Sequence, residues 1–456
     1  MLPDAVTDAL EADFDAHLER LFELLRVPSI ANARGRPDPC RRCAELLCDQ
    51  MNAVGLCAEV VVAPGKPVVL GSARAEAPDA PRLLIYAHYD VQPPDPLDAW
   101  DGAPFEPVIR DGAIYARGAG DDKGPLWASL MAVAAWRRAG GLPVHVTFLF
   151  EGEEEIGSPN IEAVVAEHAD RLSADAAAVV DTPFFAEDLP SVTCGLRGLA
   201  AMEVTLYGPA SEVHSGRHGG AVANPANALA RLVGALRDDA GRVTLEGFYD
   251  DVRDVADAER VAWDELPFDE ADYAASLGVD ALTGGEDGRD VLHRIWARPT
   301  LDCNGLVAGY TGAGTKTIIP ARATAKISCR LVPEQDPHRV AESFRDFVAR
   351  HTPAGLRSEA TVTATARPFL LPPDSPALQA GCAALREAYG RTPARVRCGA
   401  SIPITECLQR QAGVEAVLLG CTSPCGNPHA PNEHYPLRLL RGTARAVAAM
   451  MQHLAR

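Results

Sequence analysis

Apolar residues recur at helical spacing in two stretches near the start of the chain. In the first stretch the repeat runs until Pro28 and consists of Leu10, Phe14, Leu18, Leu21 and Leu25. Proline cannot continue a helix, so the pattern predicts one helix that ends before Pro28. A second helix is predicted from about residue 39 to residue 54, and Gly55 follows its end.

Apolar runs of strand length alternate with helical patterns up to residue 181. Two such runs are residues 82–87 and 144–150. A helix is predicted over residues 125–139, with Pro125 at its start and Gly140 after its end. This alternation predicts an α/β fold, in which a largely parallel sheet carries helices on both faces.

The pattern changes near residue 198. Residues 199–207 and 323–331 alternate between apolar and polar positions, which is typical of strands with one buried face. With helices predicted over 224–236 and 337–350, this stretch is expected to form a smaller α+β domain.

The first pattern resumes after residue 372, with a helix over 376–389, an apolar run at 415–420 and a final helix over 437–454. We therefore expect a catalytic domain formed by residues 1–198 and 371–456. Residues 199–370 would be inserted into it as a separate domain. The acidic stretch 250–298 predicts no particular element.

The chain has 456 residues and a formal net charge of -19. That length is sufficient for two domains with complete cores. The acidic balance argues against nucleic acid and anionic membranes as partners, since both require clustered Lys and Arg. No stretch approaches the ~20 apolar residues of a membrane span. The first residues lack the basic start and apolar core of a signal peptide, so we expect a cytoplasmic protein.

The twelve cysteines are expected to stay reduced in that compartment. Cys40 with Cys43, and Cys421 with Cys425, have spacings that zinc ligands can show. Neither pair has a matching second pair nearby, so we expect small buried hydrophobic residues rather than structural zinc.

Acidic residues and a histidine stand at the ends of the predicted strands. His88-x-Asp90 follows one apolar run, and the glutamates 153–155 follow another. The carboxyl ends of strands in such a sheet converge on one crevice, so these side chains are expected to lie together. His88 and Asp90 would point to the same side of an extended segment, where Asp90 can hold the second nitrogen of a metal-binding imidazole.

Asp121 belongs to a glycine-rich turn, Gly118-Ala-Gly-Asp-Asp-Lys-Gly124, before the helix at Pro125. The third glycine is displaced from the dinucleotide-binding pattern, and two aspartates would face a pyrophosphate. The turn therefore fits a metal better than an anion. Considered alone, it also fits an ordinary solvated turn.

Two residues at further strand ends complete the candidate set. The predicted ligands are two imidazoles and three carboxylates: His88, Asp121, Glu155, Asp181 and His429. This set, which contains no thiolate, suits zinc, manganese or cobalt. A metal hydrolase also needs a carboxylate that is free to take a proton from water, and neighbouring glutamates can divide the two roles.

Ordered motifs across nearly the whole chain resemble the dinuclear metal hydrolases of the aminoacylase and carboxypeptidase G superfamily. The resemblance is greatest to the cytosolic non-specific dipeptidase and carnosinase branch. The motifs include Ala87-His88-Tyr89-Asp90-Val91-Gln92-Pro93, Phe150-Glu151-Gly152-Glu153-Glu154-Glu155-Ile156-Gly157-Ser158, Val213-His214-Ser215-Gly216, Lys316-Thr317-Ile318-Ile319-Pro320, Ser328-Cys329-Arg330-Leu331-Val332-Pro333, Gly399-Ala400-Ser401-Ile402-Pro403 and His429-Ala430-Pro431-Asn432-Glu433. The chain departs from that branch at Arg397-Cys398-Gly399-Ala400, where Arg-Glu-Gly-Gly is usual.

The resemblance implies two divalent metal ions per subunit, zinc in the first place and manganese or cobalt as alternatives. Asp121 would bridge the two ions. His88 and Asp181 would complete one site, and Glu155 and His429 would complete the other.

The resemblance also implies how substrate is bound. His214 would reach across a homodimer interface and polarise the scissile carbonyl group, while Arg330 would hold the terminal carboxylate. Thr317 and Ser401 match positions near the substrate. The inserted domain would then serve as a lid and as the dimerisation domain.

The implied function is metal-dependent hydrolysis of dipeptides or short peptides that have a free C-terminal carboxylate. Asp90 would orient His88, and Glu154 would be the general base that activates a metal-bound water. The alternative within the superfamily is an N-acyl-amino-acid deacylase of the acetylornithine or succinyl-diaminopimelate type. Outside the enzymes, the alternative is an inactive binding protein on the same scaffold.

Overall fold

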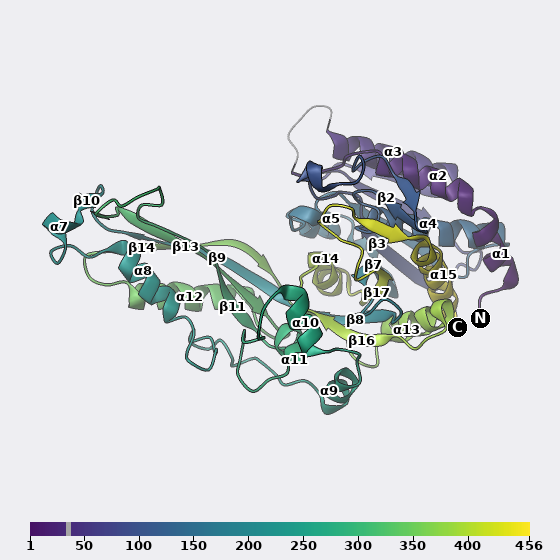
Figure 1. Cartoon of the computed structure of the whole chain (residues 1–456). Helices are drawn as coiled ribbons and strands as arrows, with labels where there is room; N and C mark the ends of the chain where they lie inside the picture. The colour runs from purple at the N-terminus through teal and green to yellow at the C-terminus, as the bar shows by residue number, and fades with distance from the viewer. Residues whose placement is uncertain (33–37) are drawn as a thin grey trace. The chain divides into compact units, whose positions relative to one another are not determined.

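A computed structural model describes residues 1–32 and 38–456. Its elements are labelled in Figure 1. The contacts divide the chain into two compact units: residues 1–194, 371–396 and 402–456 form the first, and residues 195–370 and 397–401 form the second. Within the described part of the chain, no helix combines the length and apolar character that a membrane span requires.

A mixed sheet with strand order β1-β2-β6-β3-β7-β17-β8 runs through the first unit. Four central strands are parallel to one another: β6 (His145–Glu151), β3 (Arg82–His88), β7 (Ala176–Pro183) and β17 (Ala416–Thr422). Antiparallel pairings flank them through β1 (Cys57–Val61), β2 (Val68–Ala73) and β8 (Ser191–Leu196). The predicted α/β fold is confirmed, with a parallel centre and antiparallel strands on either side.

The parallel centre decides where polar side chains gather. Strand β3 ends at His88 and β6 ends at Glu151, while Asp181 lies near the end of β7. Because these strands share one direction, their carboxyl ends meet at one edge of the sheet. The loops that follow them are therefore neighbours in space.

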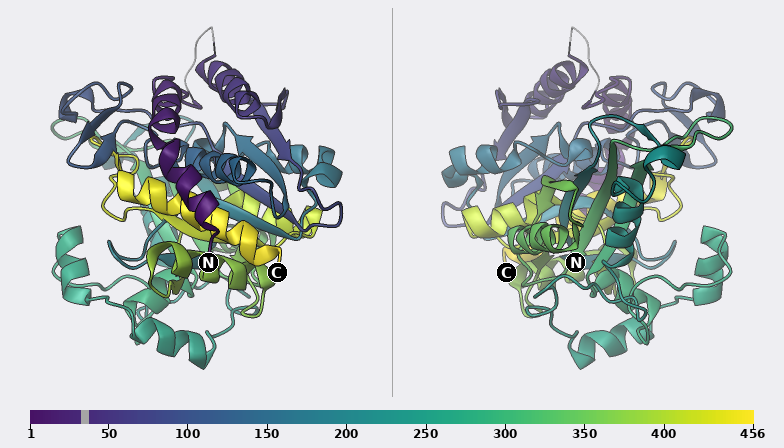
Figure 2. Two further views of the ribbon diagram at one scale, coloured as in Figure 1. Left: turned by 90° about the vertical axis from the view of Figure 1, so that its right-hand side faces the viewer. Right: turned by 90° about the vertical axis from the view of Figure 1, so that its left-hand side faces the viewer.

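Helix α4 (Lys123–Arg138) is almost entirely buried. It contacts α1 (Asp4–Ala12), α2 (Phe14–Leu25), α15 (Leu437–Leu454) and strands β3 and β7. The indole of Trp136 donates a hydrogen bond of 3.0 Å to the carbonyl oxygen of Ala448 on α15. In Figure 2 the first helix lies beside the last, so the two ends of the chain are close together within this unit.

The helix predicted across residues 10–25 is in fact two helices, because Asp13 leaves the helical conformation between α1 and α2 (φ -101°, ψ 3°). The other elements of the first unit are α3 (Pro39–Ala53), α5 (Ile161–Glu167), α6 (Ala169–Leu172), α13 (Pro376–Tyr389), α14 (Pro403–Cys407), and a small sheet of β4 (Val108–Arg110), β5 (Ala113–Tyr115) and β18 (His434–Pro436).

The second unit has a four-stranded antiparallel sheet of order β11-β13-β9-β14. Its strands are β11 (Thr300–Ala308), β13 (Arg322–Leu331), β9 (Gly198–Tyr207) and β14 (Arg357–Ala366). Helices α8 (Pro225–Gly234) and α12 (Pro337–His351) pack on this sheet. Alternate residues of β13, from Ala323 to Leu331, are buried beneath them, as the alternating pattern predicts.

The stretch from residue 250 to 298 contains three short helices, α9 (Asp257–Asp264), α10 (Glu270–Leu277) and α11 (Val291–Trp296). Trp263 and Trp296 pack edge to face with ring centres 5.1 Å apart. The remaining short strands are β10 (Val213–His214), β12 (Ile318–Ile319), β15 (Phe369–Leu370) and β16 (Ala394–Cys398), and the four-residue helix α7 (Ser215–His218) follows β10.

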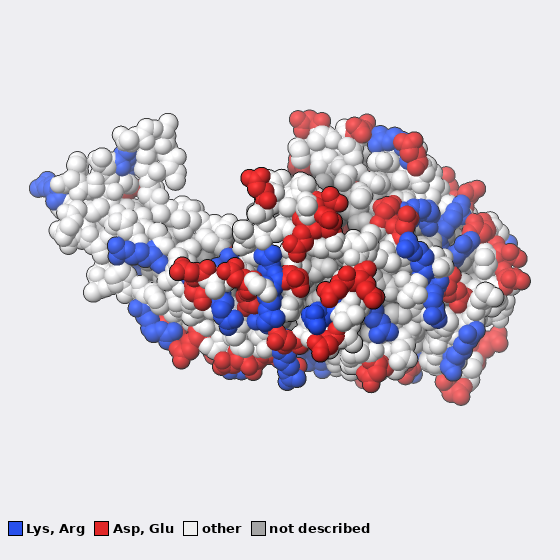
Figure 3. All heavy atoms as spheres, turned by 60° about the horizontal axis from the view of Figure 1, so that its bottom comes forward, with Lys and Arg blue, Asp and Glu red and all other residues white. Residues whose placement is uncertain are grey.

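Charged side chains of both signs are mixed on one face of the molecule. On the face drawn in Figure 3, acidic side chains are interspersed with basic ones, and the basic ones do not merge into one area. The chain carries 62 acidic and 43 basic residues.

Candidate metal centre

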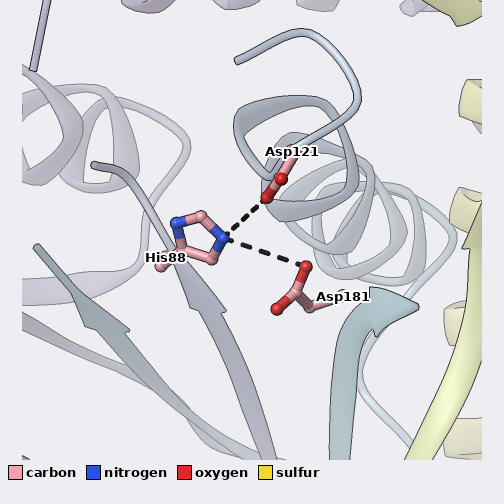
Figure 4. Close-up of side chains that lie close together, drawn as sticks. All are labelled: His88, Asp121 and Asp181. Atoms are coloured by element: carbon pink, nitrogen blue, oxygen red, sulfur yellow. Dashed lines mark hydrogen bonds and ion pairs between the residues drawn. The ribbon is translucent and has the colours of Figure 1, made fainter. Parts of the chain in front are cut away.

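The imidazole of His88, at the end of β3, is fully buried and faces two carboxylates. Its Nε2 atom lies 3.0 Å from Oδ1 of Asp121 and 3.8 Å from Oδ1 of Asp181. Figure 4 shows both carboxylates directed at the same ring nitrogen. The three side chains come from separate segments of the first unit and could hold one metal ion between them.

A second group stands beside the first. Nε2 of His429 lies 2.9 Å from Oδ2 of Asp121 and 3.1 Å from Oε2 of Glu155. These three residues also have the arrangement of a candidate metal site. The side chain of His429 is 57 % exposed, whereas that of Glu155 is 4 % exposed, so the cluster reaches solvent on the His429 side.

Asp121 is common to both groups. Its Oδ1 atom faces His88 and its Oδ2 atom faces His429. The structure thus brings together all five candidate ligands, in two groups that share one carboxylate. A shared carboxylate is how two cations are held a few ångströms apart in dinuclear sites.

The electrostatics of the cluster fit a bound cation. Burial, together with the nearby carboxylates of Asp121 and Glu155, raises the pKa of Asp181 to about 8 against the opposing charge of His88. Hydrogen bonds to Asp121 and Glu155 raise the pKa of His429 to about 10. Without a metal, then, these groups must retain protons to balance the crowded negative charge. Divalent cations would replace those protons, and the nitrogen and oxygen donors present suit them.

Asp90 links His88 to the glutamate triplet. The side chains of His88 and Asp90 are fully buried, and Nδ1 of His88 lies 3.3 Å from Oδ1 of Asp90. The same carboxylate accepts hydrogen bonds from the backbone N–H groups of Glu154 at 3.2 Å and Glu155 at 3.0 Å. Asp90 therefore fixes the imidazole and the glutamate backbone together.

The three adjacent glutamates have different surroundings. Glu153 is buried and accepts a hydrogen bond of 2.7 Å from the side chain of Asn160. Glu155 belongs to the metal cluster, and Glu154 is half-buried. Burial raises the pKa of Glu154 to about 8, and the charge of nearby His88 opposes that shift. Such a carboxyl group can take up a proton near neutral pH.

Gln92 is a residue that the sequence analysis did not single out. Its side-chain amide donates 2.8 Å and 3.1 Å hydrogen bonds to Oε2 and to the carbonyl oxygen of Glu155. It holds a candidate ligand by both side chain and backbone. The sequence offered one indication of this role: Gln92 lies two residues after Asp90 and therefore on the same side of the extended segment.

In the second unit, His214 and Thr317 are brought together by the pairing of β10 with β12. The backbone N–H of Ser215 donates to the carbonyl oxygen of Thr317 at 3.0 Å. His214 is exposed, and its Nδ1 atom accepts a 3.0 Å hydrogen bond from the N–H of Gly216. This acceptor role assigns the proton of the neutral ring to Nε2.

Arg330 and Ser401 form another pair in the same unit. The guanidinium of Arg330 donates to Oγ of Ser401 at 3.1 Å, and that hydroxyl donates to the carbonyl oxygen of Arg197 at 2.5 Å. Within the described residues, neither Arg330 nor Arg197 has a carboxylate in ion-pair distance. Burial lowers the pKa of Arg197 to about 10, and the charge of Arg330 adds to that shift.

None of the twelve cysteines forms a disulfide. Cys40, Cys43 and Cys421 are buried, as expected, but Cys425 is exposed, because it lies in the turn that follows β17. Among the described residues, neither candidate metal group contains a cysteine.

Comparison with known proteins assigns the chain to a family. The model of the peptidase family M20/M25/M40 matches residues 84–453, a span that includes every candidate metal ligand. The chain belongs to this peptidase family. The resemblance to dinuclear metal hydrolases is thereby confirmed, and the chain is a peptidase-type hydrolase.

Several relatives of this M20 family member have named activities. The Cys-Gly metallodipeptidase dug1 of Schizosaccharomyces pombe is 31% identical over 82% of the chain and 80% of the relative. The human Beta-Ala-His dipeptidase is 30% identical over 81% of the chain and 74% of the relative. The M20 family metallo-carboxypeptidase Sso-CP2 from Sulfolobus solfataricus has a similar structure, with a TM-score of 0.87, 31% identity and coverage of 96% of the chain and 99% of its own.

Proposed function

We propose that this M20 family member is a dinuclear metal-dependent dipeptidase. The observation that carries the proposal is the shared carboxylate of Asp121, which joins two complete ligand groups in a single site. Two relatives that match most of the chain are named as dipeptidases, one of them as a metallodipeptidase.

We assign His88, Asp121 and Asp181 to one ion and Asp121, Glu155 and His429 to the other. Zinc is the ion we expect, because the donors are imidazole nitrogens and carboxylate oxygens. When bound, the two ions supply Lewis acidity, which polarises a carbonyl group and lowers the pKa of water. The protein's own part is to hold these ligand side chains in place and to position Glu154 beside them.

Glu154 is proposed as the general base. Asp90 accepts a hydrogen bond from its backbone N–H, so the position of Glu154 is fixed relative to His88. Its raised pKa, caused first by burial, matches a group that accepts a proton from water and passes it to the departing amine. Asp90 itself orients His88 and does not contact the substrate.

The second unit would supply the groups that bind the peptide. Nε2–H of His214 is available as a donor, since Nδ1 already accepts from Gly216, and it suits the oxygen of a polarised carbonyl. We propose that His214 acts in the partner subunit's site of a homodimer. In this arrangement, residues 199–370 form the lid and dimerisation domain, with Thr317 beside His214.

Arg330 is proposed to bind the C-terminal carboxylate of the substrate, supported by Ser401. A guanidinium without an acidic partner in the described chain has its charge free for an anionic ligand. A need for a free C-terminus also agrees with the carboxypeptidase named among the similar structures. Twelve cysteines without a disulfide suit a reducing compartment, and we propose a cytoplasmic location.

The test is a substrate panel with the zinc-loaded protein. Unmodified dipeptides, the same dipeptides with C-terminal amides, and N-acetyl and N-succinyl amino acids are compared by kcat/KM. We expect turnover of the free dipeptides. Turnover confined to acylated amino acids would replace this proposal with deacylation, and bound metal without any turnover would indicate a binding protein.

A further inference from the structure

A buried carboxylate with no role in the proposed mechanism lies directly beside the candidate metal ligands. Glu433 is 1 % exposed, and four N–H donors surround its carboxylate. Oε2 accepts from the guanidinium of Arg117 at 2.7 Å and from the backbone of Gly118 at 3.0 Å. Oε1 accepts from the backbone of Gly120 at 2.9 Å and of Asp121 at 3.1 Å. Each oxygen thus receives two hydrogen bonds.

These contacts join two segments that carry candidate ligands. Glu433 lies four residues after His429, and three of its four donors belong to the glycine-rich turn that contains Asp121. The carbonyl oxygen of Glu433 also accepts from the N–H of Ala116 at 3.2 Å. The turn is therefore wrapped around one side chain of the His429 segment.

The shape of the turn depends on this arrangement. Gly118 has a φ of +85°, which favours glycine, and a Cβ there would lie 2.7 Å from Val91. Arg117 is 1 % exposed, stacks 5.4 Å from the ring centre of Trp100, and donates to the carbonyl oxygen of Pro93 at 3.3 Å. Glu433 is thus fixed from one side by Arg117 and holds the backbone of the turn on the other.

We propose that Glu433 is a positioning residue that sets Asp121 relative to His429. Both metal sites would then depend on the hydrogen bonds that the Glu433 carboxylate accepts. This inference rests on the assignment of the metal ligands made above. Glu433 is not a member of either candidate ligand group among the described residues. It acts on the bridging ligand through the backbone, and groups that orient ligands in this way typically govern metal affinity.

A purely structural role would have a different signature. Loss of any buried ion pair weakens the fold, but only loss of a positioning group weakens metal binding in protein that remains folded. The chain offers a matched control in the second unit, where Glu286 is 5 % exposed and pairs with Arg298 at 2.6 Å and 3.1 Å. Glu286→Gln removes a buried ion pair remote in sequence from every candidate ligand.

The experiment compares the whole chain with its Glu433→Gln and Glu286→Gln variants. Zinc is removed with a chelator, and binding is measured by titration calorimetry on protein that circular dichroism shows to be folded. We expect Glu433→Gln to bind zinc about 10- to 100-fold more weakly than the unaltered chain. Glu286→Gln should bind zinc normally, even if both variants unfold at lower denaturant concentration.

Glu433→Asp covers the case in which Glu433→Gln does not fold, because it keeps the charge opposite Arg117 but is too short to reach all four donors. Unchanged zinc affinity in a folded Glu433 variant would overturn the inference, as would an equal loss in Glu286→Gln or failure of the unaltered chain to bind zinc. If the unaltered chain binds two zinc ions but cleaves no dipeptide, the proposed function fails while the positioning role stands.

Discussion

The Oδ2 atom of Asp121 lies 2.9 Å from Nε2 of His429, although the two residues are in widely separated parts of the sequence. The other oxygen of the same carboxylate faces the first ligand group. A carboxylate used in this way serves both groups, so no other single residue should matter as much for metal content.

Replacement of Asp121 by alanine should therefore reduce metal content as well as activity. We expect fewer than two bound ions per chain by elemental analysis after dialysis, because both groups lose a ligand. The exposed residue Asp98 provides the control, since Asp98→Ala should keep full metal content. Retention of two ions in Asp121→Ala would remove Asp121 from the bridging role.

The Glu154→Gln variant should keep its metals and lose most of its turnover. An amide cannot accept the proton that a carboxylate accepts, and such groups typically contribute about 10²- to 10⁴-fold to the rate. The measurement is kcat on a dipeptide, with metal content determined on the same sample.

Glu153→Gln is the matched control for the glutamate triplet. Glu153 is hydrogen-bonded to Asn160, so its variant should retain near-normal kcat. If Glu153→Gln were inactive and Glu154→Gln active, the general base would be the wrong member of the triplet.

Arg330→Met should weaken binding of substrates with a free C-terminus. A charge-assisted hydrogen bond contributes about 1.5–3 kcal/mol, so KM should rise roughly 10- to 150-fold with less change in kcat. Arg322→Met, on the same face of β13 and exposed, is the control. The C-terminal amide of the same dipeptide should show little difference between Arg330→Met and the unaltered chain, and an equal loss on both substrates would contradict carboxylate binding.

A homodimer with shared sites makes a prediction for mixed subunits. His214→Ala and Glu154→Gln should each be inactive, but a mixed dimer contains one site with both groups intact. With random exchange, half of the dimers are mixed and one of their two sites works, so roughly a quarter of normal activity should return. Mixed dimers that form, as native mass spectrometry can establish, yet stay inactive would exclude a borrowed histidine.

His17 on α2 should make the fold sensitive to acid. It is 8 % exposed and packs edge to face on Trp127 at 6.0 Å, and burial lowers its pKa from 6.5 to about 4. Between these pH values the unfolded chain binds a proton that the folded chain excludes. The free energy of unfolding should therefore fall as pH drops from 6.5 to about 4, by up to ~3 kcal/mol from this residue.

Denaturant titrations of metal-free protein across that pH range measure the effect. His17→Leu should show a shallower decline than the unaltered chain, while substitution of the exposed His338 should leave the slope unchanged. Parallel pH profiles for the unaltered chain and His17→Leu would show that protonation of His17 does not lower the free energy of unfolding.

The sequence predicts an element well where its ends are marked by local chemistry. Helix α13 was expected over residues 376–389 and spans Pro376–Tyr389. Ser375 caps its first turn, and Gly390 ends it with a φ of +69°. The break at Asp13 was missed because the apolar spacing continues through it, and spacing does not report the backbone angle of one polar residue.

Helix α10 was missed for the opposite reason. Asp269 accepts hydrogen bonds from the N–H groups of Ala271 and Asp272, and Gly278 ends the helix, so both end signals were present. The helix buries only Ala274, however, and therefore carries almost no apolar repeat. The antiparallel pairing of β2 with β6 was likewise not predicted, because an apolar run looks the same in β2 and in the parallel strand β3.

The candidate ligands could be found from the sequence because each follows an apolar run. Their roles came from a family resemblance and remain predictions for this chain. What the sequence did not reveal was the layer that holds them, such as Gln92 against Glu155 and Glu433 against the Asp121 turn. Those contacts join residues by loop geometry, which has no periodic signature.

The position of β17 has a consequence for how the protein is made. This strand pairs with β7 on one side and with β8 on the other, yet it is synthesised after the whole of the second unit. On the ribosome, the first half of the sheet must wait with an open edge at β7 while residues 195–370 emerge and fold as a unit of their own. Until translation is nearly complete the nascent chain has no His429 segment, so a truncated product would hold at most half of the dinuclear centre. We expect such products to be recognised by chaperones through the exposed edge.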